Sequence, residues 1–214
     1  MLQLCLFLPI VFGIGNSKTL AYCAILLCFA TSIVLLNKNK HSILQCVALF
    51  ATACADYFLI LKGGVNKDVA MCFFVVAQLA YGLRTLCMAS AKKEITINLT
   101  ARALLCVLLV AGALLVVDDT PAFVVVSMVY FANLVANVFF TLLHFKQNKL
   151  FALGLVLFVC CDVFVGLKEM IGLFGWGEEL FVVKMLTSNI SVHSIFYHPS
   201  QVLLSISAKN KNIK

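Results

Sequence analysis

The sequence predicts an all-α fold, a polytopic membrane bundle of about eight transmembrane helices. Hydrophobic residues make up 63% of the 214 positions and charged residues only 12%, whereas soluble domains average roughly 25% charged residues. The hydrophobic residues gather in runs of the length needed to cross a hydrocarbon core of about 30 Å. These runs lack the alternation of barrel strands, and only helices or closed barrels satisfy their backbone hydrogen bonds in lipid.

Charged and turn-forming residues divide the chain into eight predicted helices. The first is short for a full span, so the alternative for it is a half-inserted helix. The last is overlong and contains Lys184 and Pro199, which predicts an interfacial stretch or a kink. In chain order the predicted helices are Leu2–Ile14, Thr19–Leu36, Ile43–Leu61, Val69–Ser90, Leu99–Val117, Ala122–Phe145, Leu150–Leu167 and about Leu180–Ser207.

The charges between the helices predict the orientation of the bundle. Only four basic residues lie in one set of turns, where they are accompanied by acidic residues: Lys18, Lys62, Lys67 and Lys168. The positive-inside rule then places both termini in the cytoplasm, and in the plasma membrane if the protein is bacterial. The net charge of +7 reflects this topology, and no basic motif of a nucleic-acid partner is present. The opposite turns and the tail hold Lys38, Lys40, Lys92, Lys93, Arg102, Lys146, Lys149, Lys209, Lys211 and Lys214.

Two aspartates lie inside apolar predicted helices, in matching phrases 106 positions apart. The phrases are Cys54-Ala-Asp56-Tyr-Phe58-Leu-Ile-Leu61 and Cys160-Cys-Asp162-Val-Phe164-Val-Gly-Leu167. An ionisable side chain at bilayer depth costs roughly 2.5–3.5 kcal/mol on insertion scales, so it indicates a functional site by default. An alternative is that each aspartate forms a buried ion pair with Arg84 or Lys184.

The matching phrases predict a duplicated unit of four helices. Four helices return the chain to its starting side, so the two units form a parallel four-plus-four repeat. We expect a single integral membrane domain over residues 1–214, with half-repeats of about 1–94 and 95–207 and a basic tail at 208–214. Both aspartates then lie at similar depth, nearer the outer half, and we expect their carboxyls to approach one another.

Other polar residues in later helices accompany the aspartates. They share one face within each helix: Gln78 with Tyr81, Tyr197 with Gln201, and Tyr130 with Asn133 and Asn137. We predict that Gln78, Tyr81, Asn133, Tyr197 and Gln201 bind substrate. The alternative, favoured most for Asn133 and Asn137, is hydrogen bonding between helices. The ten cysteines lie at no metal-ligand spacing with histidine, so no metal or cofactor is predicted.

At these residues the chain resembles the YhhN-like integral membrane family, whose characterised members are lysoplasmalogenases. The matching phrases are Ala55-Asp56-Tyr-Phe-Leu59, Gln78-Leu-Ala-Tyr81, Cys161-Asp162-Val-Phe-Val165 and Tyr197-His-Pro-Ser-Gln201-Val-Leu203. Gln78 and Val165 stand where the family pattern has histidine and leucine, and Pro199 interrupts the last phrase. The resemblance implies about eight helices, a lysophospholipid substrate in the membrane, and hydrolysis of its vinyl ether bond.

Two buried carboxyls suit that chemistry. A vinyl ether hydrolyses by protonation on carbon, and water captures the resulting oxocarbenium ion. Asp56 and Asp162 would divide the roles of acid and base, as paired carboxyls do in glycoside hydrolysis. Two alternatives remain open from sequence. One is a proton-coupled transporter or channel that uses the same aspartates, and the other is a non-catalytic membrane scaffold.

Overall fold

Helices and short turns form all of the chain that the computed structural model describes, which is residues 10–12, 17–63, 65–89, 91–117, 120–174 and 192–209. Within these ranges there is no β-strand. The α-helices are α2 (Ser17–Val34), α3 (Lys40–Asp56), α4 (Lys67–Leu86), α5 (Lys92–Val116), α6 (Ala122–Leu143), α7 (Lys149–Phe174) and α9 (Val192–Ile206). A π-helical segment, η1 (Tyr57–Leu61), continues α3, and a 3-10 turn, η2 (Ser207–Lys209), ends α9.

Six of the predicted helices correspond to α2 through α7. The largest differences are at α5, which begins at Lys92 instead of Leu99, and at α7, which ends at Phe174 instead of Leu167. The polar first turns of α5 also have good helix formers. The first predicted helix lies almost entirely outside the described residues, and so do residues 180–191 of the last one. The eight-helix count therefore stays a prediction. Five of the helices are long and apolar enough to cross a membrane, by length and composition: α3 with η1, α4, α5, α6 and α7.

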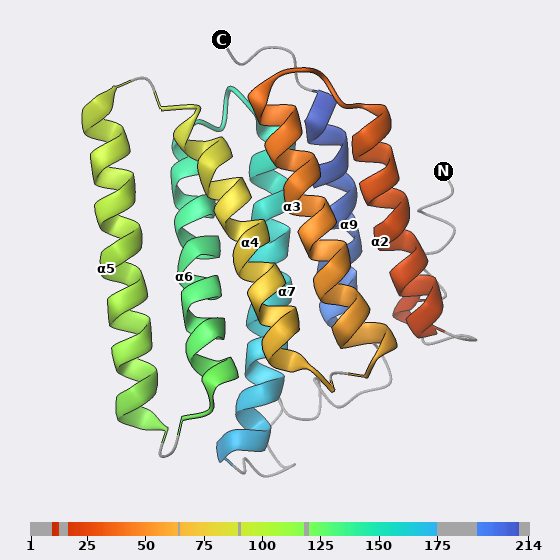
Figure 1. Cartoon of the computed structure of the whole chain (residues 1–214), viewed down its shortest axis with the longest axis vertical. Helices are drawn as coiled ribbons and strands as arrows, with labels where there is room; N and C mark the ends of the chain where they lie inside the picture. The colour runs from red at the N-terminus through yellow and green to blue at the C-terminus, as the bar shows by residue number, and fades with distance from the viewer. Residues whose placement is uncertain are drawn as a thin grey trace.

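The helices form an up-and-down bundle (Figure 1). Helices α3 and α7 run in the same direction, α5 lies at one edge against α6, and α2 lies at the other edge. The most extensive packing joins α3 to α4 and α7 to α9, while α4 packs on α6. This pattern is compatible with two similar halves, but the repeat itself stays a prediction.

The turns after α2, α4 and α6 share one end of the bundle with the end of α9 (Figure 1). We call this the basic end, because Lys38, Lys92, Lys146 and Lys209 lie there. Arg102, counted with the turn residues in the sequence, lies inside α5 with its side chain only 8% exposed. The correction has a physical reason, since amide oxygens on α5 and α6 accept from its guanidinium and so compensate for its burial.

Small residues allow the helices to approach one another closely. At Gly154 on α7, an added Cβ would lie 2.8 Å from Leu204 Cγ on α9. At Gly82 on α4, an added Cβ would lie 2.9 Å from an Arg102 guanidinium nitrogen. Such close approach is typical of membrane helix pairs, which associate by packing and polar contacts. Helices α3 and α4, which pack extensively together, are likewise rich in buried alanines: Ala48, Ala51, Ala53, Ala55, Ala70, Ala77 and Ala80.

Candidate active site

Each of the two helix-embedded aspartates accepts a hydrogen bond from a tyrosine on another helix. The Tyr197 hydroxyl of α9 donates to Asp56 Oδ2 at the end of α3. The Tyr130 hydroxyl of α6 donates to Asp162 Oδ2 on α7. Two equivalent pairs therefore link four helices. Asp56 is the last residue of α3, at the end of the helix away from the basic end, and Asp162 lies at the middle of α7.

The two tyrosine–aspartate pairs are close neighbours. The carboxyls of Asp56 and Asp162 lie within electrostatic range of one another, and so do Tyr130 and Tyr197. Phe74 and Phe158 form an aromatic bridge between the tyrosines. The ring centroids lie 5.4 Å apart from Tyr130 to Phe74, 6.4 Å apart from Phe74 to Phe158, and 5.6 Å apart from Phe158 to Tyr197. The hydrogen bonds and the aromatic rings thus join Asp56 and Asp162 in one cluster, while the direct approach of the two carboxyls stays a prediction.

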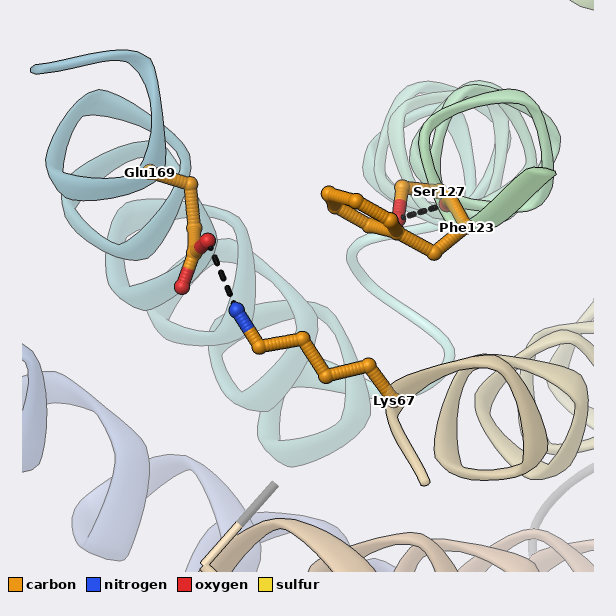
Figure 2. A network of polar contacts seen from close by, with 4 residues as sticks. All are labelled: Lys67, Phe123, Ser127 and Glu169. Atoms are coloured by element: carbon orange, nitrogen blue, oxygen red, sulfur yellow. Dashed lines mark hydrogen bonds and ion pairs between the residues drawn. The ribbon is translucent and has the colours of Figure 1, made fainter. Parts of the chain in front are cut away.

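The surroundings of the pairs are apolar and largely closed. Asp56 is 3% exposed, Tyr130 6% and Tyr197 9%, whereas Asp162 is partly buried. Among the described residues neither aspartate forms an ion pair. The ion pairs in those ranges involve glutamates instead. Figure 2 shows one of them, Lys67 on α4 reaching Glu169 on α7 at 2.9 Å beside the Phe123 ring.

The helix geometry changes directly after Asp56. Helix α3 ends at this residue, and η1 continues with the wider π-helical turn, in which Lys62 N donates to Tyr57 O at 3.1 Å. Single π-helical turns inside α-helices are frequent at functional sites. Here the wider turn shifts the side chains that follow Asp56 around the helix axis.

A second polar cluster lies nearer the basic end and holds Arg84. The Arg84 guanidinium donates to Gln45 Oε1, to Ser207 Oγ and to Ser207 O, and it lies over the Phe151 ring at 4.1 Å. It joins α3, α4, α7 and η2 and is 1% exposed. Because it contacts neither aspartate, the ion pair considered from sequence is absent here. Lys184, the other cation considered, lies outside the described residues.

Arg102 organises a third polar cluster between α4, α5 and α6. Its guanidinium donates to Asn98 Oδ1, to Asn137 Oδ1 at 2.7 Å and to Thr85 Oγ1 at 3.2 Å. Asn137 Nδ2 in turn donates to Gln78 O and Gln78 Oε1, both at 2.9 Å. We refer to the Arg84 and Arg102 clusters together as the polar layer. It braces the bundle between the basic end and the aspartates.

The predicted substrate-binding residues fall into two groups. Tyr197 contacts a carboxyl, whereas Gln78 and Asn133 bond within the polar layer. The buried Tyr81 ring lies 5.7 Å from Phe151, and its hydroxyl is near Gln45 and Thr52 without hydrogen-bonding geometry to either. Gln201 is fully buried, and its amide has no hydrogen-bond partner among the described residues. Substrate binding by these residues stays a prediction.

Tyr130 is the site residue that the sequence leaves unassigned. It is visible there only as the first member of the polar stripe that continues to Asn133 and Asn137. The stripe correctly indicates a buried face of α6. The stripe does not indicate that Tyr130 contacts α7, whereas Asn137 contacts α4 and Asn133 contacts α5.

Comparison with protein families adds an independent finding to this geometry. Residues 17–207 match the YhhN family over nearly the whole chain. The chain belongs to the YhhN family. Comparison with curated proteins and with solved structures gives no significant match. Family membership and the apolar helices together indicate a membrane protein, and the YhhN phrases around Asp56 and Asp162 lie within the matched region.

Proposed function

We propose that this YhhN-family chain is a membrane hydrolase that cleaves the vinyl ether bond of a lysoplasmalogen. The products are a fatty aldehyde and a glycerophospho head group. The observation that carries the proposal is the pair of neighbouring carboxyls, each hydrogen-bonded by a tyrosine hydroxyl, in an apolar part of the bundle. The resemblance of the flanking phrases to lysoplasmalogenases supports the choice of substrate.

The proposed reaction needs one neutral and one ionised carboxyl. Burial and a neighbouring carboxyl both favour keeping a proton on one member of such a pair. That member delivers its proton to the vinyl carbon C2, and positive charge develops on C1 and the ether oxygen. The ionised member stabilises this charge, as a carboxylate does at other oxocarbenium-like transition states. Tyr130 and Tyr197 hold the two carboxyls in position through their hydroxyls.

Water completes the proposed reaction. It adds to C1 and gives its proton to the ionised carboxyl, which leaves a hemiacetal. The bond from C1 to the glycerol oxygen then breaks as that oxygen takes up a proton and the hemiacetal hydroxyl loses one. Overall, one water is consumed and no metal or redox step is needed.

Two further parts of the proposal concern the setting of the site. We place the basic end in the cytoplasm, because basic residues concentrate on that side of membrane proteins. The carboxyl pair then lies in the outer half of the membrane, accessible to a single-chain lipid. A transporter is the less favoured alternative, since the described helices are continuous apart from η1 and transport sites are typically formed by broken helices.

The proposed activity is tested with purified protein in detergent. Incubation with a lysoplasmalogen is expected to release fatty aldehyde, while the saturated 1-O-alkyl analogue of the same head group yields none. The 1-acyl analogue is expected to yield no fatty acid, because an ester has no vinyl carbon for the carboxyl acid to protonate. Absence of aldehyde from monodisperse, well-folded protein, or equal cleavage of the acyl analogue, would refute the proposal.

A further inference from the structure

The similarity between the two sequence segments that contain Asp56 and Asp162 extends to a lysine beyond each aspartate. Each is followed by a lysine at the same offset, so that Lys62 stands six residues after Asp56 and Lys168 stands six residues after Asp162. Six residues correspond to a rise of about 9 Å along an α-helix. Both lysines therefore lie closer to the bundle end opposite the basic end than the carboxyls do. In the proposed membrane orientation, either lysine at this level faces the head-group region.

The surroundings of Lys62 connect it to Asp56. Its ammonium lies 5.8 Å from the centroid of the Tyr57 ring, which lies 6.1 Å from the Tyr22 ring on α2. Tyr22 is partly exposed and lies within electrostatic range of Asp56. Lys62, Tyr57 and Tyr22 thus lie together where α2 packs against η1, close to the Asp56 carboxyl.

Lys62 is also available to an anionic ligand. Its side chain is exposed, and it forms no ion pair among the described residues. By contrast, the nearby Lys67 pairs with Glu169 (Figure 2). Lys168 has the same offset as Lys62 but lies in an uninterrupted α-helix, within electrostatic range of His193 on α9. The wider turn of η1 and the tyrosine pair therefore distinguish Lys62 from the other two lysines.

We propose that Lys62 binds the phosphate of the lysolipid head group while the vinyl ether bond lies at the carboxyl pair. This inference rests on the proposed function and adds to it the residue that selects a phosphorylated substrate. The glycerol backbone separates the ether oxygen from the phosphate by roughly 5–7 Å at about 1.5 Å per bond. Lys62 lies one wide η1 turn beyond Asp56, and its long flexible side chain can cover this span.

The test compares Lys62→Gln with two matched controls, Lys168→Gln and Lys67→Gln. Each variant is assayed with an alkenyl-glycerophospholipid and with alkenylglycerol, which has the same vinyl ether but no phosphate. For Lys62→Gln we expect KM to rise roughly three- to tenfold for the phospholipid, with kcat unchanged, the range set by one partly exposed charge-assisted contact. KM for alkenylglycerol is expected to stay the same. In the two control variants, KM is expected to show no change that differs between the two substrates.

Ionic strength provides a second measurement. Salt screens exposed charges, so KM of the unmodified protein for the phospholipid is expected to rise with salt and that of Lys62→Gln to change less. Equal losses on both substrates would mean that Lys62 is only structural and would overturn the proposal. An unchanged KM in Lys62→Gln, or a substrate-selective rise in Lys168→Gln instead, would also overturn it.

Direct binding separates failure of this inference from failure of the proposed function. If no substrate yields aldehyde, the binding of a radiolabelled 1-O-alkyl-lysophospholipid to the detergent-solubilised protein is measured. Weaker binding by Lys62→Gln, with normal binding by Lys168→Gln, would support the phosphate site without any hydrolysis. Equal binding by both variants and the unmodified protein would exclude it.

Discussion

Asp56→Asn and Asp162→Asn are each expected to lower aldehyde release by at least about 100-fold while leaving the folded protein intact. Acid–base assistance by a positioned side chain contributes typically 10²–10⁴-fold. Asparagine keeps the volume of aspartate and can still accept a hydrogen bond from Tyr197 or Tyr130 through its amide oxygen. It cannot deliver or accept a proton at the reacting carbon or water. Turnover and the yield of monodisperse protein in detergent are measured together.

The control for these variants is Asp68→Asn, which changes an exposed aspartate at the start of α4. It is expected to keep full turnover. If the aspartates were structural members of ion pairs, each substitution would strand a buried charge at a cost of about 3–5 kcal/mol and reduce the yield. Full yield with lost turnover supports catalysis, whereas retained turnover in either variant contradicts it.

Tyr130→Phe and Tyr197→Phe are expected to lower kcat by about ten- to hundredfold each. Each substitution keeps the ring and removes one hydroxyl that donates to a carboxyl. A hydrogen bond to a charged group contributes about 1.5–3 kcal/mol, which sets this range. The rings remain in contact with Phe74 and Phe158, so the midpoint of thermal unfolding in detergent should change little.

Tyr81→Phe is the matched comparison, because its hydroxyl lies in the polar layer beside Gln45. We expect this variant to keep most of its turnover. A loss as large as that of Tyr197→Phe would support the substrate-binding role predicted for Tyr81 from sequence. It would also contradict our proposal that only the two tyrosine–aspartate pairs take part in the reaction.

Most of the fold could be predicted from the sequence because length and hydrophobicity determine where a membrane helix lies. The predicted boundaries of α2, α3 with η1, and α6 differ from the structure by only a few residues. The start of α5 and the end of α7 each differ from the prediction by seven residues, because polar helical turns extend the apolar stretch there. Hydrophobicity identifies the stretch that is buried in lipid, and it says nothing about helical turns that extend beyond it.

The candidate site was predictable only in part. The two aspartates stand out because each is an isolated acid in an apolar run, and their common depth follows from helix direction. Their tyrosine partners depend on which helices are neighbours, and the order of helices in the chain does not determine this. The sequence motif around Gln201 predicts a role for Tyr197. Tyr130 stands out in the sequence only as part of a polar stripe on one helix. The buried positions of Arg84 and Arg102 likewise depend on amide and carbonyl oxygens from distant helices.

Isotope labelling tests the central claim, protonation of the vinyl carbon by the carboxyl pair, most directly. The reaction is run in D₂O, the aldehyde is reduced immediately to the alcohol so that later exchange cannot occur, and the product is analysed by mass spectrometry. We predict one solvent deuterium at C2 in every product molecule, and loss of product formation in Asp56→Asn and Asp162→Asn. Aldehyde that carries no deuterium at C2 would contradict the mechanism.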